Sequence, residues 1–166
     1  MKKYLVACVF SALLLIGGLP VTAEEGIHRE QVFSLMQEAL NDQGSLSEEI
    51  RTEKDIKGKL NDHFTEEFID KFYKANVVQV EGGYMAFGSD FAPYYIPFFS
   101  YDDHTEVIYG ENLDYMYVQE SFEASEGGPV TSGKHVETVT LKKENDVWKV
   151  ADISYESANQ KEQADK

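Results

Sequence analysis

Apolar residues in the first half of the chain recur three and four positions apart, the spacing of one face of an α-helix. Over residues 30–40 the positions on this face are Val32, Leu35, Met36, Ala39 and Leu40. Charged and amide side chains occupy the other faces of the same turns. The pattern predicts an amphipathic helix that is ended by the polar run Asn41-Asp42-Gln43-Gly44.

Two further helices are predicted before residue 77. The segment Ser45-Leu46-Ser47-Glu48 has the form of a capping box, so we expect a second, highly charged helix over residues 48–60. Thr65 is the expected N-cap of a third helix, because two glutamates follow it in the first turn. The inward face of this third helix carries Phe68, Ile69, Phe72 and Tyr73.

The pattern changes to that of β-strands after Asn76. Two short runs at residues 77–80 and 84–87 flank a pair of glycines, which predicts a hairpin. Further strands are expected at residues 105–109, 113–124, 135–143 and 147–155, the last two joined by a polar turn. Helices grouped before strands indicate an α+β domain with N-terminal helices and a mostly antiparallel sheet.

One segment between the predicted strands, residues 91–101, is rich in aromatic side chains and contains two prolines, which disfavour a central strand. Aromatic rings bind sugars and other planar or apolar ligands, and tyrosine adds a hydroxyl group. We therefore expect Tyr94, Tyr95 and Tyr101 to rim a ligand pocket. The alternative is that the apolar side chains fill the core, namely Phe91, Ile96, Phe98 and Phe99, with the tyrosines half buried beside it.

An acidic run with one histidine follows the aromatic segment. Asp102 or His104 could act as the base of a lyase- or isomerase-like enzyme, if its pKa were shifted toward neutrality in an apolar cavity. The alternative is a polar turn between strands. We assign no catalytic residue. The sequence also holds no calcium-loop, phosphate-binding or nucleophile-elbow motif, and we expect neither a cofactor nor a metal site.

The first 23 residues have the features of a cleavable signal peptide. Lys2 and Lys3 precede an uncharged apolar run, and the small residues before Glu24 suit cleavage after Ala23. An apolar helix of this length spans only about 22 Å, too short for a stable membrane anchor. Cys8 precedes the apolar run, which does not fit a lipoprotein signal. We therefore predict a protein secreted to the exterior of the cell envelope.

Cleavage would leave about 143 residues, the size of one domain. We expect a single domain over residues 24–156 and a polar, flexible tail over residues 157–166. Loss of two lysines would change the formal net charge from −15 to −17. A surface this acidic repels nucleic acid. Loss of Cys8, the one cysteine, would exclude disulfides and a cysteine nucleophile.

Two resemblances extend this picture. The final hairpin, with Trp148 followed by alternating apolar residues, is similar to the last strand of the nuclear transport factor 2-like superfamily. Residues 64–69 and 88–100 resemble a secreted family of unknown function from low-GC Gram-positive bacteria. The first resemblance implies a cone, in which a curved sheet wraps around a long helix and leaves a pocket at its open end. The second implies no activity.

These observations favour an exported, non-catalytic domain with an aromatic-rimmed pocket for a small apolar, carbohydrate-like or peptide ligand. The partner would be a small ligand or an extracellular protein. The alternatives are the enzyme that uses Asp102 or His104, and a protein-interaction module or homodimer.

Overall fold

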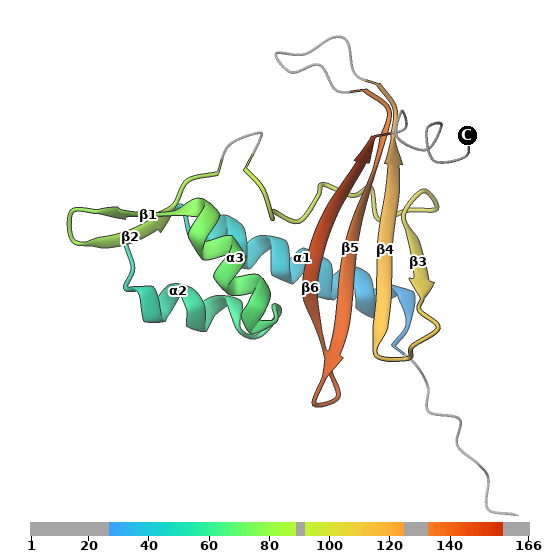
Figure 1. Ribbon diagram of the computed structural model, residues 1–166, viewed down its shortest axis with the longest axis horizontal. Coiled ribbons are helices and arrows are strands. Elements are labelled where there is room, and N and C mark those ends of the chain that lie inside the picture. Colours follow the sequence, from blue (N-terminus) through green and yellow to red (C-terminus); the bar gives the residue numbers. More distant parts are fainter. Residues whose placement is uncertain (1–26, 89–91, 125–132, 158–166) are drawn as a thin grey trace, which may run out of the picture.

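A computed structural model describes residues 27–88, 92–124 and 133–157 of the chain (Figure 1). The elements follow the predicted order, with helices first and strands after them, so the α+β class is confirmed. The helices are α1 (Arg29–Ser45), α2 (Glu53–Leu60) and α3 (Glu66–Asn76). The strands are β1 (Val77–Val80), β2 (Gly83–Ala86), β3 (Glu106–Tyr109), β4 (Tyr115–Phe122), β5 (His135–Glu144) and β6 (Val147–Ser157). The signal segment, Phe91 and the predicted tail beyond Ser157 lie outside the described residues.

The helix starts are set by side chains that accept hydrogen bonds from free backbone N–H groups. Thr65 caps α3 as predicted, its hydroxyl oxygen lying 3.3 Å from the donating N–H of Phe68. The predicted start of the second helix is wrong. Ser45 is the last residue of α1, where its hydroxyl donates to Asp42 O at 2.8 Å, and the chain turns before Thr52 caps α2. The capping-box pattern therefore falls at a helix end.

The strands form two antiparallel sheets. β1 and β2 make a separate hairpin, and the larger sheet has the order β3-β4-β5-β6. In Figure 1, α1 lies behind the larger sheet, while α2 and α3 lie beside β6. The β5–β6 turn consists of Asn145 and Asp146, whose φ angles of 50° and 64° match the two left-handed positions of a type I′ turn.

The segment between α2 and α3 joins the edge of the larger sheet. The N–H of Thr65 donates to Val150 O at 2.9 Å, and the N–H of Val150 donates to His63 O at 2.8 Å. These two bonds form a parallel bridge between Phe64 and Val150. The helical half of the chain is thus connected to the last strand by backbone hydrogen bonds as well as by packing.

One hydrophobic core lies between the helices and the larger sheet. Its largest fully buried side chains include Phe64, Phe68 and Phe72, and the rings of Phe64 and Phe68 stack with their centroids 5.1 Å apart. Met116 of β4 and Leu141 of β5 belong to the same buried cluster. No helix in the described ranges is long and apolar enough to cross a membrane.

Candidate functional site

The aromatic segment, defined here as residues 92–101, connects the β1–β2 hairpin to β3 without forming a strand. Two of its tyrosines adopt left-handed backbone conformations, with φ of 67° at Tyr94 and 54° at Tyr101. Non-glycine residues in this region carry conformational strain and persist only where neighbouring groups hold them. Neighbouring groups must therefore hold the backbone in place at Tyr94 and Tyr101.

Buried amide side chains hold the first half of the aromatic segment. Gln43 of α1 is fully buried, donating to Tyr94 O at 2.7 Å and accepting from the N–H of Ile96 at 2.9 Å. Asn76, at the end of α3, donates to Pro93 O at 2.8 Å. The two amides supply the hydrogen bonds that a neighbouring strand would supply in a sheet.

A buried carboxylate holds the second half. Glu120 of β4 is 8% exposed, and its Oε2 accepts from the N–H of Ser100 at 2.9 Å and from the hydroxyl of Thr105 at 2.6 Å. Thr105 Oγ1 in turn accepts from the N–H of Tyr101 at 2.9 Å. Arg29 of α1 donates to the carbonyl oxygens of Asp102 and Thr105. The segment is therefore fixed along its length by groups from α1, α3 and β4.

The three tyrosines of the sequence prediction are each half buried and contact different parts of the core. Tyr94 packs edge-on against Phe68, and Tyr95 packs edge-on against Phe72 with centroids 5.1 Å apart. The ring of Tyr101 lies edge-on to Phe33, 5.3 Å between centroids. The structure therefore places all three tyrosines against the core and does not gather them at one point.

Phe98 does not belong to the core. The alternative in which the apolar side chains of this segment fill the core is therefore wrong for Phe98. Its side chain is 85% exposed, whereas Ile96 and Phe99 are buried. The reason is a tight turn, in which the N–H of Phe99 donates to Pro97 O at 2.9 Å and leaves Phe98 at the apex. The aromatic segment thus presents one phenyl ring to solvent.

The hydroxyl of Tyr101 is buried and has no hydrogen-bond partner within the described part of the chain. Burial, with a smaller contribution from the nearby Glu120 charge, raises the pKa of Tyr101 to about 12. A buried hydroxyl without a partner lowers stability, because it has lost its bonds to water.

Replacement of Tyr101 by phenylalanine should therefore leave the free energy of unfolding at neutral pH unchanged or raise it by about 1 kcal/mol. The folded state keeps the phenol proton up to a higher pH than the unfolded state does. The wild-type protein should thus lose stability as the pH rises from about 10 to about 12. Denaturant titrations at several pH values should show that the free energy of unfolding of the variant falls less at alkaline pH than that of the wild-type protein. A variant much less stable at neutral pH would show that the hydroxyl has a partner.

Asp102 and His104 lie together in the turn before β3, as the polar-turn alternative predicted. Asp102 Oδ1 is 2.8 Å from His104 Nδ1 and also accepts from the hydroxyl of Ser100. The hydrogen bond from the backbone N–H of His104, followed by those from the Ser100 hydroxyl and the His104 side chain, lowers the pKa of Asp102 to about 2, and the bond to Asp102 raises the pKa of His104. The two side chains are 55% and 79% exposed. A carboxylate with this pKa is a weak base, and neither group is in an apolar cavity.

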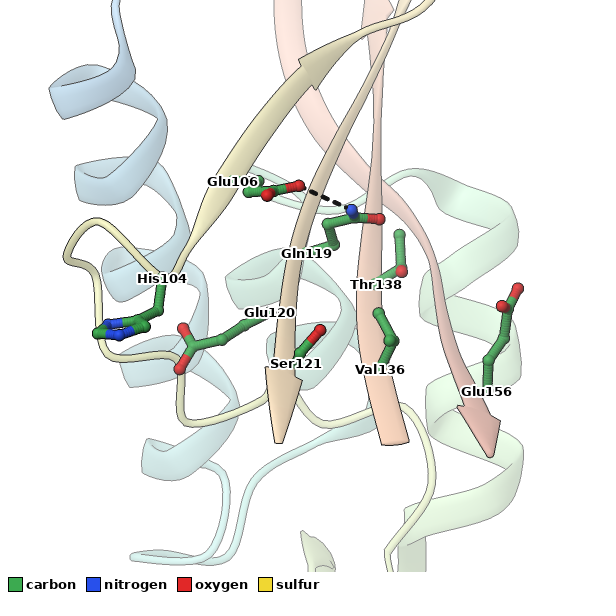
Figure 2. Close-up of a pocket in the computed structure, with 8 residues that line it drawn as sticks. All are labelled: His104, Glu106, Gln119, Glu120, Ser121, Val136, Thr138 and Glu156. Carbon is green, nitrogen blue, oxygen red and sulfur yellow. Dashed lines mark hydrogen bonds between the residues drawn. The ribbon is translucent and has the colours of Figure 1, made fainter. Parts of the chain in front are cut away.

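A polar hollow of about 250 Å³ lies over one end of β3, β4, β5 and β6 (Figure 2). It is lined by His104, Glu106, Gln119, Glu120, Ser121, Val136, Thr138 and Glu156. Gln119 and Ser121 alternate along β4 with the buried Val118 and Glu120, so they lie on the sheet face opposite α1. β3 pairs only with residues 116–119 of β4. The edge of β4 at Glu120 therefore has no β3 partner and lies beside His104.

Sequence reasoning did not identify Gln43 and Glu120, which hold the aromatic segment, although the hydrophobic pattern of the sequence contains a signal for both. Gln43 occupies an apolar position of the α1 pattern, seven residues after Met36. Glu120 continues the inward alternation of Met116 and Val118. A polar residue at a core position requires a buried partner, and the aromatic segment contains the unpaired backbone groups that provide it.

The fold and these features define an α+β domain with a rigidly held aromatic segment and an open, polar sheet face. Residues 28–122, more than half of the chain, match the family described as "Protein of unknown function (DUF3993)". The chain belongs to this family. The matched region runs from the N-cap of α1 to the end of β4 and includes Gln43, Asn76, Glu120 and the aromatic segment. No curated protein matches the chain.

Proposed function

We propose that this protein is an exported, non-catalytic binding domain that recognises its ligand with the aromatic segment. The ligand would be a small apolar or carbohydrate-like molecule or a peptide, bound outside the cell after removal of residues 1–23. We further infer a nuclear transport factor 2-like cone and an origin in a low-GC Gram-positive bacterium. The cone is supported by α1 lying across one face of the antiparallel sheet (Figure 1).

The observation that carries this proposal is the way the aromatic segment is held. Three buried polar side chains, Gln43, Asn76 and Glu120, are used to fix an irregular segment that contains two left-handed tyrosines. Binding residues are commonly found on loops that a rigid scaffold holds in position in this way. Fixing a loop before binding reduces the conformational entropy lost on binding, which raises affinity.

The aromatic segment also offers a suitable contact group. Phe98 is 85% exposed at the apex of its turn, and an exposed phenyl ring provides a flat apolar face with little conformational freedom to lose. Burial of such a side chain in a complex contributes about 1.5–3 kcal/mol. Tyr94, Tyr95 and Tyr101 lie in the same segment and would extend the contact surface.

The test is to replace Phe98 by alanine and measure binding to a library of cell-wall fragments, oligosaccharides and short peptides. We expect ligands of the wild-type protein to lose affinity by about tenfold or more, since the loss of one buried aromatic contact corresponds to at least that factor. Stability should not change, because the ring contacts solvent. Leu113→Ala is the matched control, since Leu113 is 83% exposed in the β3–β4 turn.

The proposal is wrong if Phe98→Ala, Tyr94→Ala and Tyr95→Ala all bind every ligand of the wild-type protein with unchanged affinity. Light scattering of the same proteins tests the interaction-module alternative. A dimer that dissociates in Phe98→Ala but not in Leu113→Ala would identify the partner of the aromatic segment as a second copy of the chain.

A further inference from the structure

The C-terminal part of β6 lies at an edge of the larger sheet. At Val150 this edge is already occupied, because the N–H and C=O of Val150 bind the α2–α3 connection at 2.8 and 2.9 Å. Residues 152–157, which we call the β6 edge, pair with β5 on one side, and on the other side no backbone hydrogen bond joins them to another described segment. In the view of Figure 1, this end of β6 extends beyond α3. An unpaired strand edge is a template for a further strand.

The ladder with β5 shows which backbone groups of the β6 edge point outward. Val150 directs its N–H and C=O away from β5, toward the α2–α3 connection. Its partner and that of Asp152 are consecutive residues of β5, and Ala151 is the extra residue of a bulge between them. Consecutive residues of a strand direct these groups to opposite sides, so Asp152 bonds to β5 and the next residue points outward. The β6 edge therefore offers the N–H and C=O groups of Ile153 and Tyr155.

Side chains of two kinds alternate along the β6 edge. Asp152 and Glu156 lie on the open sheet face, where Glu156 lines the polar hollow. Ile153 and Tyr155 lie on the opposite face, and the ring of Tyr155 is 56% exposed and stacks on His135 with the centroids 4.5 Å apart. An added strand would therefore place its side chains in turn beside carboxylates and beside apolar groups.

We propose that the β6 edge binds an extended peptide in which basic residues alternate with apolar ones. The basic side chains pair with Asp152 and Glu156, the apolar ones contact Ile153 and Tyr155, and the peptide backbone bonds to the outward groups, as in recognition by strand addition. Residues 63–65 are an example within the chain, since they bind the same side of β6 as an extended segment. The formal net charge of −15 attracts a basic peptide before it binds.

A second copy of the chain fits the β6 edge less well. Antiparallel pairing centred on Ser154 would bond Ile153 of each copy to Tyr155 of the other. The same register would place Asp152 opposite Glu156, and like charges directly opposite each other are destabilising. Residues 152–157 contain neither proline nor lysine, which commonly protect an edge against any added strand. The charges of the β6 edge thus disfavour its own copy and favour a basic segment.

The experiment is a titration of the full chain with the peptide acetyl-Lys-Val-Lys-Val-Lys-Val-Lys-amide, followed by hydrogen exchange of the backbone amides measured by NMR. At saturation the amides of Ile153 and Tyr155 should exchange about tenfold more slowly or less, because they gain a partner. Those of Asp152 and Ser154 already bond to β5 and should change little. A peptide of the same composition with four lysines followed by three valines is the control. Equal protection by this control would show a general charge effect and would overturn the proposal.

Two N-methylated forms of the alternating peptide test the backbone hydrogen bonds. One form carries the methyl groups on its three valines and the other on three of its lysines. In a strand only alternate N–H groups face the neighbouring strand, so one form loses its bonds to the β6 edge and the other keeps them. The first should bind about tenfold or more weakly than the second. Loss in the valine form indicates antiparallel pairing, loss in the lysine form indicates parallel pairing, and equal binding of the two forms contradicts strand addition.

Substitutions in the protein test the same edge. Tyr155→Pro removes an outward N–H without breaking the ladder to β5, a change that edge strands tolerate, and Tyr155→Ala removes the ring alone. The dissociation constant of the peptide should be about tenfold higher for Tyr155→Pro than for Tyr155→Ala. Glu156→Gln should raise it about twofold to fivefold through loss of an exposed ion pair, whereas Glu111→Gln, in the exposed β3–β4 turn, should leave it unchanged. If Tyr155→Pro does not fold, the two N-methylated peptides still decide the question.

The proposal fails if the alternating peptide leaves the exchange of Ile153 and Tyr155 unchanged, or if Glu111→Gln weakens binding as much as Glu156→Gln does. Phe98→Ala should bind the alternating peptide as the wild-type protein does, because Phe98 is not part of the β6 edge. Failure at the β6 edge is thus distinguishable from failure of the binding proposed for the aromatic segment.

Discussion

Replacing Phe68 with alanine is expected to lower the free energy of unfolding by about 3–5 kcal/mol. The ring of Phe68 is fully buried, stacks on Phe64 at 5.1 Å and meets Tyr94 edge-on at 6.1 Å. Its removal leaves a cavity where α3, the α2–α3 connection and the aromatic segment meet. Because small domains are stable by only about 5–15 kcal/mol, a large share of the total would be lost.

Urea titrations followed by circular dichroism measure this effect directly. Phe98→Ala is the matched control, since the same side chain is removed from an 85% exposed position and the midpoint should not change. Phe68→Leu should lie between the two, because it fills part of the cavity. Equal midpoints for Phe68→Ala and Phe98→Ala would contradict the position of Phe68 in the core.

Replacing Gln43 with methionine is expected to cost about 2–4 kcal/mol of stability, although the volume of the side chain hardly changes. The amide bonds to Tyr94 O at 2.7 Å and to the N–H of Ile96 at 2.9 Å. Both backbone groups would lose their partner, and each unsatisfied buried group costs about 1–3 kcal/mol. The left-handed conformation of Tyr94 would also lose its support.

Gln37→Met on the exposed side of α1 is the control, because it makes the same chemical change without a buried hydrogen bond. Hydrogen exchange should show faster exchange of the Ile96 amide in Gln43→Met than in Gln37→Met. If the two variants unfolded at the same urea concentration and protected Ile96 equally, the hydrogen bonds of Gln43 would not be holding the aromatic segment.

Periodicity predicted most of the regular elements, because their side chains alternate between core and solvent in the way the pattern requires. The hairpin of β1 and β2, the capping of α3 by Thr65 and the final hairpin are confirmed. The error at the second helix has a clear cause. A capping box depends on local sequence alone, whereas Ser45 is still within α1, and Leu46, the C-cap that follows it, is fully buried in the core.

The arrangement of the candidate site was beyond sequence reasoning for a different reason. Gln43, Asn76 and Glu120 are 33 or more residues apart from one another in the chain, and only the fold brings them to the aromatic segment. Aromatic content identified the aromatic segment but did not show which of its residues is exposed. The exposure of Phe98 depends on the turn closed by the hydrogen bond between Pro97 and Phe99.

The bridge between Phe64 and Val150 has a consequence for how the chain is completed during synthesis and export. The segment that joins α2 to α3 gains its backbone partner only when β6, near the end of the chain, is available. Contacts between such distant parts form late and slow the folding of a domain. In a chain that emerges with its N-terminus first, the helical segments therefore appear well before β6 is available to close them against the sheet. If the protein is exported as we propose, its final core would form only after nearly all of it has crossed the membrane.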